Sequence, residues 1–274
     1  MKTITLLNQK GGVGKTTTAI NLGAAFSLCG LKCLLIDLDP QGNLSQSTGF
    51  QSLNESDVTT YEVLKGEDIN KGIRKKEEKE LSYDVLPTDI RLSGGEIELV
   101  NAEDRNQLLK RAIEDLDKSY DFIIIDCPPS LNIFTLMALT ASTGVIIPVQ
   151  AQYMPLNGVS YIMNTLNYVK RGDVENGVEP LNPDLEITGV LLTFYNERRN
   201  LDRDVLDALT EAFKDKVFKT KISTNTKVAE APSYGEDIIS YSKSSKGSQQ
   251  YQKLAAEILK DMKPQKRGKS NGNR

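Results

Sequence analysis

The chain alternates short apolar runs with longer segments in which apolar residues recur at helical spacing. This alternation is typical of a mostly parallel sheet covered by helices. The apolar runs predict strands over residues 3–7, 33–38, 83–86, 122–125, 145–149, 187–193 and 217–220. The longer segments predict helices over residues 16–28, 106–116, 132–140, 159–169, 203–213 and 248–262. We therefore expect an α/β fold with a doubly wound, mostly parallel sheet.

The length of 274 residues favours one large domain over two small ones. We expect this domain to span residues 1–262. Residues 263–274 contain lysines and arginines but no acidic or aliphatic residue, so they predict a flexible basic tail. The charged run at 75–80 is interpreted as a solvated connection, because blocks of mixed charge usually face water.

Composition narrows the chemistry that the chain can perform. It contains no histidine, which excludes Ser-His-Asp triads, Cys-His dyads and histidine-ligated zinc. The 34 basic and 37 acidic residues give a formal charge of -3, so binding to nucleic acid or to a membrane would need a local patch. The remaining chemistry depends on carboxylates, lysines, hydroxyls, backbone amides and hard metal ions.

The cysteines and the start of the chain indicate a cytoplasmic protein. Cys29, Cys33 and Cys127 lie in apolar contexts, where small buried thiols are expected rather than a disulfide framework. The first residues, MKTITLL, lack the apolar core of a signal peptide, and no apolar run approaches the roughly 20 residues of a membrane span.

A glycine-rich turn follows the first predicted strand and opens the first predicted helix, in the stretch NQKGGVGKTTT. Strand, turn and helix N-terminus together surround an anion with backbone N–H groups. Lys15 adds a charge for the outer phosphates, and Thr16 offers a hydroxyl to Mg²⁺. The usual pattern G-x-x-x-x-G-K-[ST] fails, because Gln9 occupies its first glycine position. The residues predicted to bind the phosphates of ATP or ADP are Lys10, Gly11, Gly12, Val13, Gly14, Lys15, Thr16 and Thr17.

Carboxylates follow two further predicted strands, in LIDLDPQGN and FIIIDCPPS. Ligands bind at the carboxyl edge of a doubly wound sheet, so these carboxylates are candidates for the site. Asp126 is placed to reach Mg²⁺ through water, although an aspartate there could also cap the next turn. Asp37 and Asp39 share one side of an extended chain. We expect Asp37 in the outer shell of the metal and Asp39 to orient the attacking water.

These motifs, with GVLLTFYNERRNL and EAPSYGEDIISY, resemble the ParA/Soj family of deviant Walker A partition ATPases from Lys2 to about residue 262. The resemblance implies a P-loop ATPase domain with slow turnover. It also implies that Lys10 crosses a dimer interface to the phosphates of the partner's nucleotide, as a catalytic residue beside Lys15 and Asp39. The alternative is that Lys10 is an ordinary solvated lysine.

The resemblance further implies that Asn196 hydrogen-bonds adenine and that the loop over residues 223–225 encloses the base. The family commonly has Ile-Pro where this chain has Ile222-Ser223, so the chain departs from the family pattern at one wall of that pocket. Members of this size bind DNA nonspecifically through basic residues of the C-terminal half. The candidates are Arg198, Arg199, Lys219, Lys221, Lys227, Lys243 and Lys246, and the alternative is that they are solubilising surface charges.

The implied function is segregation of a plasmid or chromosome by an ATPase that dimerises on Mg-ATP, stimulated by a ParB-like adaptor and associated with the nucleoid. The alternative is a MinD-like ATPase at a membrane, which needs a terminal amphipathic helix. The stripe of Tyr251, Leu254, Ile258 and Met262 is better explained by packing on the sheet, so we expect no membrane partner. Iron–sulfur relatives are excluded because Cys127 has no second cysteine beside it.

Overall fold

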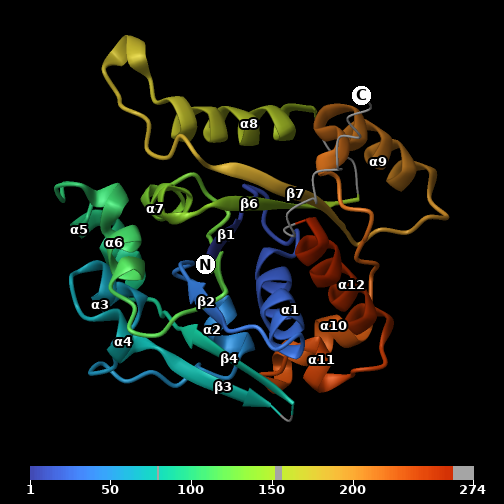
Figure 1. The fold of residues 1–274 in the computed structure, drawn as a ribbon, viewed down its shortest axis with the longest axis horizontal. Helices are drawn as coiled ribbons and strands as arrows, with labels where there is room; N and C mark the ends of the chain where they lie inside the picture. The colour runs from blue at the N-terminus through green and yellow to red at the C-terminus, as the bar shows by residue number, and fades with distance from the viewer. Residues whose placement is uncertain (79, 152–155, 262–274) are drawn as a thin grey trace, which may run out of the picture.

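The computed structural model describes residues 1–78, 80–151 and 156–261 (Figure 1). Its strands form one seven-stranded sheet in the order β3-β4-β2-β5-β1-β6-β7. All neighbours are parallel except β3 and β4, which are antiparallel. The strands are β1 (Lys2–Leu6), β2 (Cys33–Asp37), β3 (Arg74–Glu78), β4 (Leu81–Leu86), β5 (Phe122–Asp126), β6 (Gly144–Gln150) and β7 (Glu186–Thr193). The α/β class with a doubly wound, mostly parallel sheet is thereby confirmed.

Helices cover both faces of this sheet. The helices are α1 (Lys15–Leu28), α2 (Asn43–Ser47), α3 (Thr60–Leu64), α4 (Ile69–Gly72), α5 (Leu92–Glu98), α6 (Leu108–Glu114), α7 (Ile133–Ala141), α8 (Leu156–Arg171), α9 (Asn200–Phe213), α10 (Thr226–Glu230), α11 (Ile238–Tyr241) and α12 (Lys246–Asp261). Helices α1, α11 and α12 lie on one side of the sheet, and α7 and α8 lie on the other (Figure 1). The central strands β2 and β5 therefore send alternate side chains into cores on opposite faces of the sheet.

The central strands of the sheet are covered on both faces, which explains their near-continuous apolar sequences. In β2 and β5 every residue is buried, including the terminal aspartates Asp37 and Asp126. Leu35 and Ile124 pack in the core with α1, whereas Leu34 and Ile123 pack in the core on the opposite face. A strand covered on both faces has no solvent side, which explains the absence of polar alternation.

The strand predicted over 217–220 is wrong. This segment makes only an isolated parallel bridge between Val190 and Val217. The backbone N–H groups of Lys219 and Thr220 donate to the Glu257 carboxylate on α12, at 2.7 and 3.0 Å, and so turn away from β7. A ladder cannot form when its donors bond to a helix side chain instead.

The charged run at 75–80 was also misinterpreted, because its residues 75–78 belong to the edge strand β3. Lys76 pairs with Tyr83 of β4, and Lys75 pairs with Asp84. Backbone pairing satisfies an edge strand whatever its side chains are, and charge is common there. The sequence of an outermost strand is therefore a weak signal for predicting it as a strand.

Helix α12 ends the described chain at Asp261. Three of the four residues of its predicted apolar stripe, Tyr251, Leu254 and Ile258, are at most 1% exposed and pack in one core with α1, as expected. The fourth, Met262, and the predicted tail over 263–274 lie outside the described residues, so the assignment of residues 1–262 to one domain stays a prediction.

Candidate nucleotide-binding site

Residues 8–14 form a turn between β1 and α1. Gly12 and Gly14 have φ values of 73° and 88°, in the left-handed region that other residues avoid. Gly14 is the N-cap of α1 and makes no side-chain cap, so the first N–H groups of the helix are left for a ligand. The Asn8 amide donates to the carbonyl of Pro148 at 2.7 Å and its Oδ1 accepts from Lys10 N at 2.9 Å, which fixes the start of the turn.

Lys10 in this turn and Lys15 at the start of α1 occupy different environments. Lys15 is 7% exposed, and its Nζ donates to the carbonyl of Lys10 at 3.5 Å, inside the turn. Burial lowers the pKa of Lys15, while the charge of Asp126 opposes this shift. The Lys10 side chain is exposed, and its Nζ donates to Gln150 Oε1 at 3.4 Å at the end of β6. The structure thus separates one internal amine from one external amine.

Thr16 and Asp126 meet beside the turn. The Thr16 hydroxyl donates to Asp126 Oδ2 at 2.6 Å, while Asp126 Oδ1 is buried without a hydrogen-bond partner. Burial raises the pKa of Asp126 to about 8, and the charge of Asp37 adds to the shift. A hydroxyl beside an under-satisfied buried carboxylate fits Mg²⁺, which takes few protein oxygens and completes its shell with phosphates and water.

No cluster of three or more histidine, cysteine or acidic side chains suited to a metal occurs among residues 1–78, 80–151 and 156–261.

Asp37 organises the turn that follows β2. Its Oδ2 accepts from the backbone N and the hydroxyl of Ser45, at 2.8 and 2.7 Å, and its Oδ1 accepts from Asp39 N at 3.2 Å. Burial raises the pKa of Asp37 to about 7, against the effect of these bonds. Both oxygens of Asp37 therefore already bind protein donors, and its role near the metal stays a prediction.

Asp39 is 6% exposed, and its Oδ1 accepts from Gln41 N at 3.0 Å. Its charge acts on the pKa values of both Lys15 and Asp126, which places the carboxylate among the groups of the site. The position is suitable for a group that orients water at the outer phosphate. Its assignment to that step stays a prediction.

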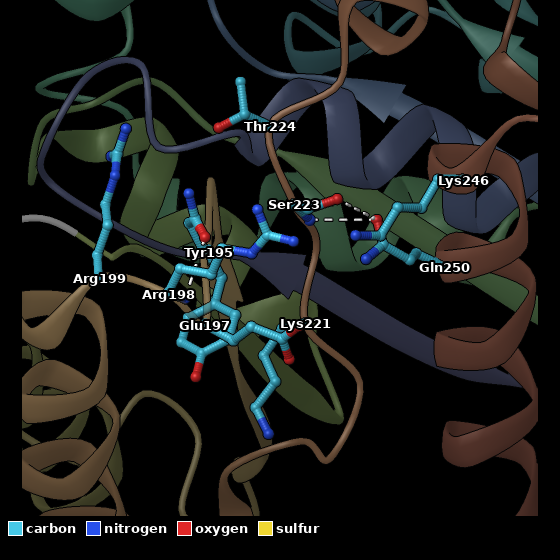
Figure 2. Close-up of a pocket in the computed structure, with 10 residues that line it drawn as sticks. Tyr195, Glu197, Arg198, Arg199, Lys221, Ser223, Thr224, Lys246 and Gln250 are labelled. Atoms are coloured by element: carbon cyan, nitrogen blue, oxygen red, sulfur yellow. Dashed lines mark hydrogen bonds between the residues drawn. The ribbon is translucent and has the colours of Figure 1, made fainter.

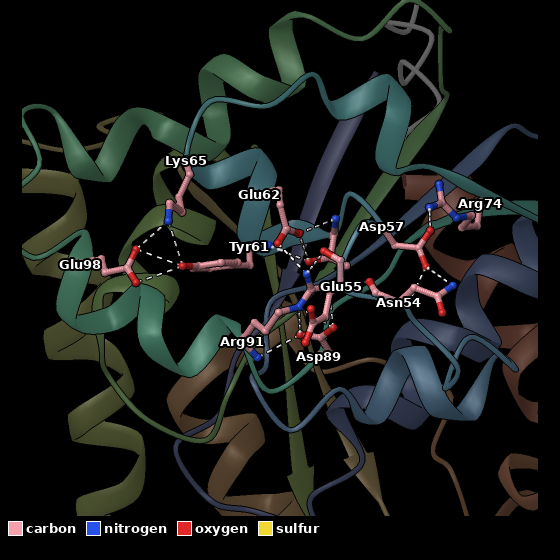
Figure 3. A network of polar contacts seen from close by, with 11 residues as sticks. Asn54, Glu55, Asp57, Tyr61, Glu62, Lys65, Arg74, Asp89, Arg91 and Glu98 are labelled. Carbon is pink, nitrogen blue, oxygen red and sulfur yellow. Dashed lines mark hydrogen bonds and ion pairs between the residues drawn. The ribbon is translucent and has the colours of Figure 1, made fainter.

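A polar network joins α3 to the loops after α2 and β4 (Figure 3). The Ser45 hydroxyl accepts from Thr88 N at 2.8 Å, which joins α2 to the loop after β4. One residue further along this loop, Asp89 binds Arg91 through both of its carboxylate oxygens, and Arg91 also pairs with Glu62 of α3 at 2.9 Å. Because Arg91 is about three-quarters buried, these ion pairs are shielded better than surface pairs.

An apolar cavity of about 250 Å³ adjoins the phosphate turn. Gly14 and Thr17 form its end nearest the turn, and residues 222–226 form one wall, which includes the loop predicted to enclose a base. Its size and its position beside the start of α1 fit a nucleoside whose phosphates lie in the turn.

Asn196 lies in a separate, polar cleft of about 590 Å³ that shares Ser223 and Thr224 with this cavity. The backbone N of Asn196 donates to Asp202 at 2.7 Å, and its Oδ1 accepts from Arg198 N at 3.1 Å. The loop around Ser223 is thus at the expected cavity, whereas contact between Asn196 and adenine stays a prediction.

Four of the seven candidate DNA-binding residues line the polar cleft (Figure 2): Arg198, Arg199, Lys221 and Lys246. The others lie outside it. Lys227 pairs with Glu230 at 3.0 Å, and Lys243 pairs with Glu80 at 2.6 Å. Lys219 is exposed but does not line the cleft. The structure therefore separates the four candidates that line the cleft from the three that lie elsewhere, a distinction that the sequence could not make.

Sequence reasoning missed Thr193 at the end of β7. Its hydroxyl donates to the carbonyl of Val13 at 2.8 Å and ties the phosphate turn to the sheet. The next residue, Phe194, has a φ of 54°, which turns the chain out beside the apolar cavity. A polar residue at the end of a predicted strand was the available signal, but nothing in the sequence pairs it with residue 13.

Comparison with known proteins agrees with this geometry. A family model described as an AAA domain matches residues 1–187. The chain is 44% identical over 257 residues to the sporulation initiation inhibitor protein Soj of Bacillus subtilis, across 94% of this chain and 98% of that protein. It is 42% identical over 261 residues to the chromosome partitioning protein ParA of Caulobacter vibrioides, across 94% of each. The chain belongs to the ParA/Soj family.

Solved structures share the fold of this ParA/Soj chain. A cobyrinic acid a,c-diamide synthase from Mycobacterium smegmatis with bound ADP and magnesium is 34% identical, with a TM-score of 0.79 over 96% of each chain. A plasmid partition protein from Borrelia burgdorferi is 25% identical, with a TM-score of 0.74 over 95% of this chain and 99% of that one. Chains with different named activities thus share this fold, so function must be argued from the site.

Proposed function

We propose that this chain is a partition ATPase that hydrolyses ATP to ADP and phosphate, dimerises on Mg-ATP and segregates a plasmid or chromosome. The observation that carries the proposal is the separation of Lys15, buried in its own phosphate turn, from Lys10, exposed at its rim. Relatives named Soj and ParA at 42–44% identity support the partition process.

The residues around the phosphate turn can each be given a role in ATP hydrolysis. The turn over residues 10–17 binds the phosphates through backbone N–H groups, and Lys15 neutralises the outer ones. Thr16 and Asp126 would hold Mg²⁺, which would neutralise the negative charge that develops on the phosphates. Asp39 orients a water molecule for attack. A weak base is sufficient, since phosphoryl transfer depends mainly on positioning and charge neutralisation, and slow turnover follows.

Lys10 supplies the charge that a dimer needs. Two triphosphates that face each other across a two-fold axis repel unless each is neutralised from the other side. Within the part of the chain that the structure describes, the exposed Lys10 amine donates to Gln150 alone, at 3.4 Å, and can leave that contact at little cost. The ligand then joins the subunits, and its hydrolysis separates them.

The polar cleft is the proposed DNA-binding surface. Arg198, Arg199, Lys221 and Lys246 gather on one side of the molecule, with Glu197 as the acidic side chain in the lining. Such a cluster binds phosphates without reading bases, and its affinity falls steeply with salt. A DNA-bound, ParB-like adaptor would stimulate hydrolysis, and the protein would act in the cytoplasm on the nucleoid.

The MinD-like alternative receives no support from α12. Tyr251, Leu254 and Ile258 of its apolar stripe are buried in the core with α1 rather than exposed to a bilayer. No helix within the described residues is long and apolar enough to span a membrane.

The test of the proposal is Lys10→Ala, analysed by size-exclusion chromatography with light scattering in Mg²⁺ and a non-hydrolysable ATP analogue. We expect ADP binding to persist and the dimer to be lost. Lys2→Ala is the matched control, because it removes an exposed lysine from the far end of β1. Lys15→Ala should instead abolish nucleotide binding. A Lys10→Ala protein that still dimerises with the analogue would refute the role of this residue.

A further inference from the structure

The wall over residues 222–226 lies between the polar cleft and the apolar cavity. Ser223 and Thr224 line both spaces, so this part of the chain is a wall with a cavity on each side. Ile222 N donates to the carbonyl of Leu192 at 2.9 Å, and Tyr195 N donates to the carbonyl of Ile222 at 3.0 Å. These bonds fix the start of the wall to the end of β7.

Beyond Ile222 the wall is held by α12. The backbone N and the hydroxyl of Ser223 both donate to Gln250 Oε1, each at 3.1 Å (Figure 2). Both groups are only partly buried, so water would replace Gln250 if its side chain were removed. One glutamine oxygen therefore holds the position of the wall between the two spaces.

The first turns of α12 pack closely against the same part of the chain. A Cβ atom on Gly247 would lie 2.3 Å from Val228, which lines the apolar cavity. Tyr251 lines that cavity as well, and its hydroxyl lies 3.5 Å from Thr18 Oγ1 on α1. Gln250 thus projects from a helix that is itself fixed against the start of α1, which makes it a rigid anchor.

We propose that Gln250 is a positioning residue for the nucleoside half of the bound nucleotide, acting through Ser223. This inference rests on the proposed function, since it requires that ATP binds in the turn and the apolar cavity. Gln250 sets where the wall stands and hence the width of the cavity. The phosphates are held by the turn between β1 and α1, on the other side, and do not depend on this contact.

The proposal predicts a selective effect. Without Gln250 the wall becomes mobile, and binding of the nucleoside must order it at a cost in affinity. The loss of a hydrogen-bonded anchor corresponds to about tenfold weaker ATP binding. Binding of inorganic tripolyphosphate, which reaches only the turn, should be unchanged. A residue with a merely structural role would weaken both ligands or neither.

The experiment compares wild type with Gln250→Ala by titration calorimetry with Mg-ATP and, separately, with magnesium tripolyphosphate. Gln249→Ala is the matched control, because this neighbouring glutamine is exposed and its side chain donates only to the carbonyl of Ser244 in the described structure. Gln250→Glu keeps an acceptor oxygen for both Ser223 donors and should restore most of the ATP affinity.

Equal ATP affinity in wild type and Gln250→Ala, or an equal loss for both ligands, overturns the inference and leaves the proposed function intact. A wild-type chain that binds no ATP overturns the proposed function and the inference with it. If Gln250→Ala does not fold, Ser223→Ala decides: it removes one of the two donors, so about threefold weaker ATP binding supports the proposal. An unchanged affinity of that variant refutes it.

Discussion

Thr193→Val is the sharpest single test of how the sheet shapes the phosphate turn. The substitution keeps the Thr193 methyl group, which would lie 3.6 Å from a Cβ atom placed on Gly14. It removes only the hydroxyl, which donates to the Val13 carbonyl at 2.8 Å. Val13 and Thr193 are 1% and 2% exposed, so water cannot readily replace the lost donor. An unsatisfied buried carbonyl costs about 1–3 kcal/mol, which sets the expected loss in the free energy of unfolding.

Part of this cost should also be seen in nucleotide affinity. The free turn can relax once its tether to β7 is gone, and binding must then restore the shape that the phosphates need. A penalty of about 1.4 kcal/mol corresponds to a tenfold rise in the dissociation constant for Mg-ATP. Titration calorimetry measures the affinity, and urea denaturation of the ligand-free chain measures the stability.

Thr5→Val is the matched control for this test. Thr5 lies in β1, and its buried hydroxyl contacts Ser142 Oγ at 2.7 Å and the carbonyl of Ala138 in α7 at 3.3 Å, so it makes no bond to the turn. It should lower stability and leave the dissociation constant unchanged. If Thr193→Val binds Mg-ATP as tightly as wild type, the turn does not depend on β7 and the reasoning is wrong.

Two further predictions concern charge. Replacing Arg198 and Arg199 with alanine should reduce the slope of log DNA affinity against log salt concentration by about 2, because each phosphate contact contributes about 0.9. Lys243→Ala is the control and should leave this slope unchanged, because Lys243 pairs with Glu80. DNA retardation at several salt concentrations with an ATP analogue measures this, and equal slopes for wild type and the double variant would contradict the assignment. Burial raises the pKa of Asp37 to about 7 and that of Asp126 to about 8, so the ligand-free folded chain keeps protons that the unfolded chain loses near pH 4. Its free energy of unfolding should therefore fall between about pH 5 and 8, by up to about 1.4 kcal/mol per pH unit for each carboxyl, and Asp126→Asn should flatten the profile. Urea denaturation in EDTA measures this, and stability that rises over the same range would show that these carboxyls are ionised in the fold.

The parts of the fold that could be predicted are those whose signal is local. Buried strands such as β2 and β5 are apolar at nearly every position, and the glycines of the phosphate turn are needed wherever φ is positive. The order of strand, turn and helix is enough to place Lys15 and Thr16. The carboxylates could be placed because the ends of parallel strands meet at one edge.

The rest of the site depends on contacts between distant segments. Thr193 bonds a residue 180 positions earlier, and Ser223 bonds Gln250 across 27 positions. Neither pair leaves a periodic trace in the sequence. The segment over 217–220 was mistaken for a strand for the same reason, since its donors bond to Glu257, whose position cannot be known before α12 is packed.

The two edge strands of the sheet limit how copies of this chain can associate. At one margin β3 runs against its neighbour and carries the charged stretch RKKEE, and at the other Phe218 and Ile222 donate to β7 at 2.9 Å and cover its outer side. Neither margin offers a free, uncharged backbone to which another copy could add a strand. Both edges therefore disfavour sheet extension between copies of this chain, so the dimer proposed above would have to form through other surfaces.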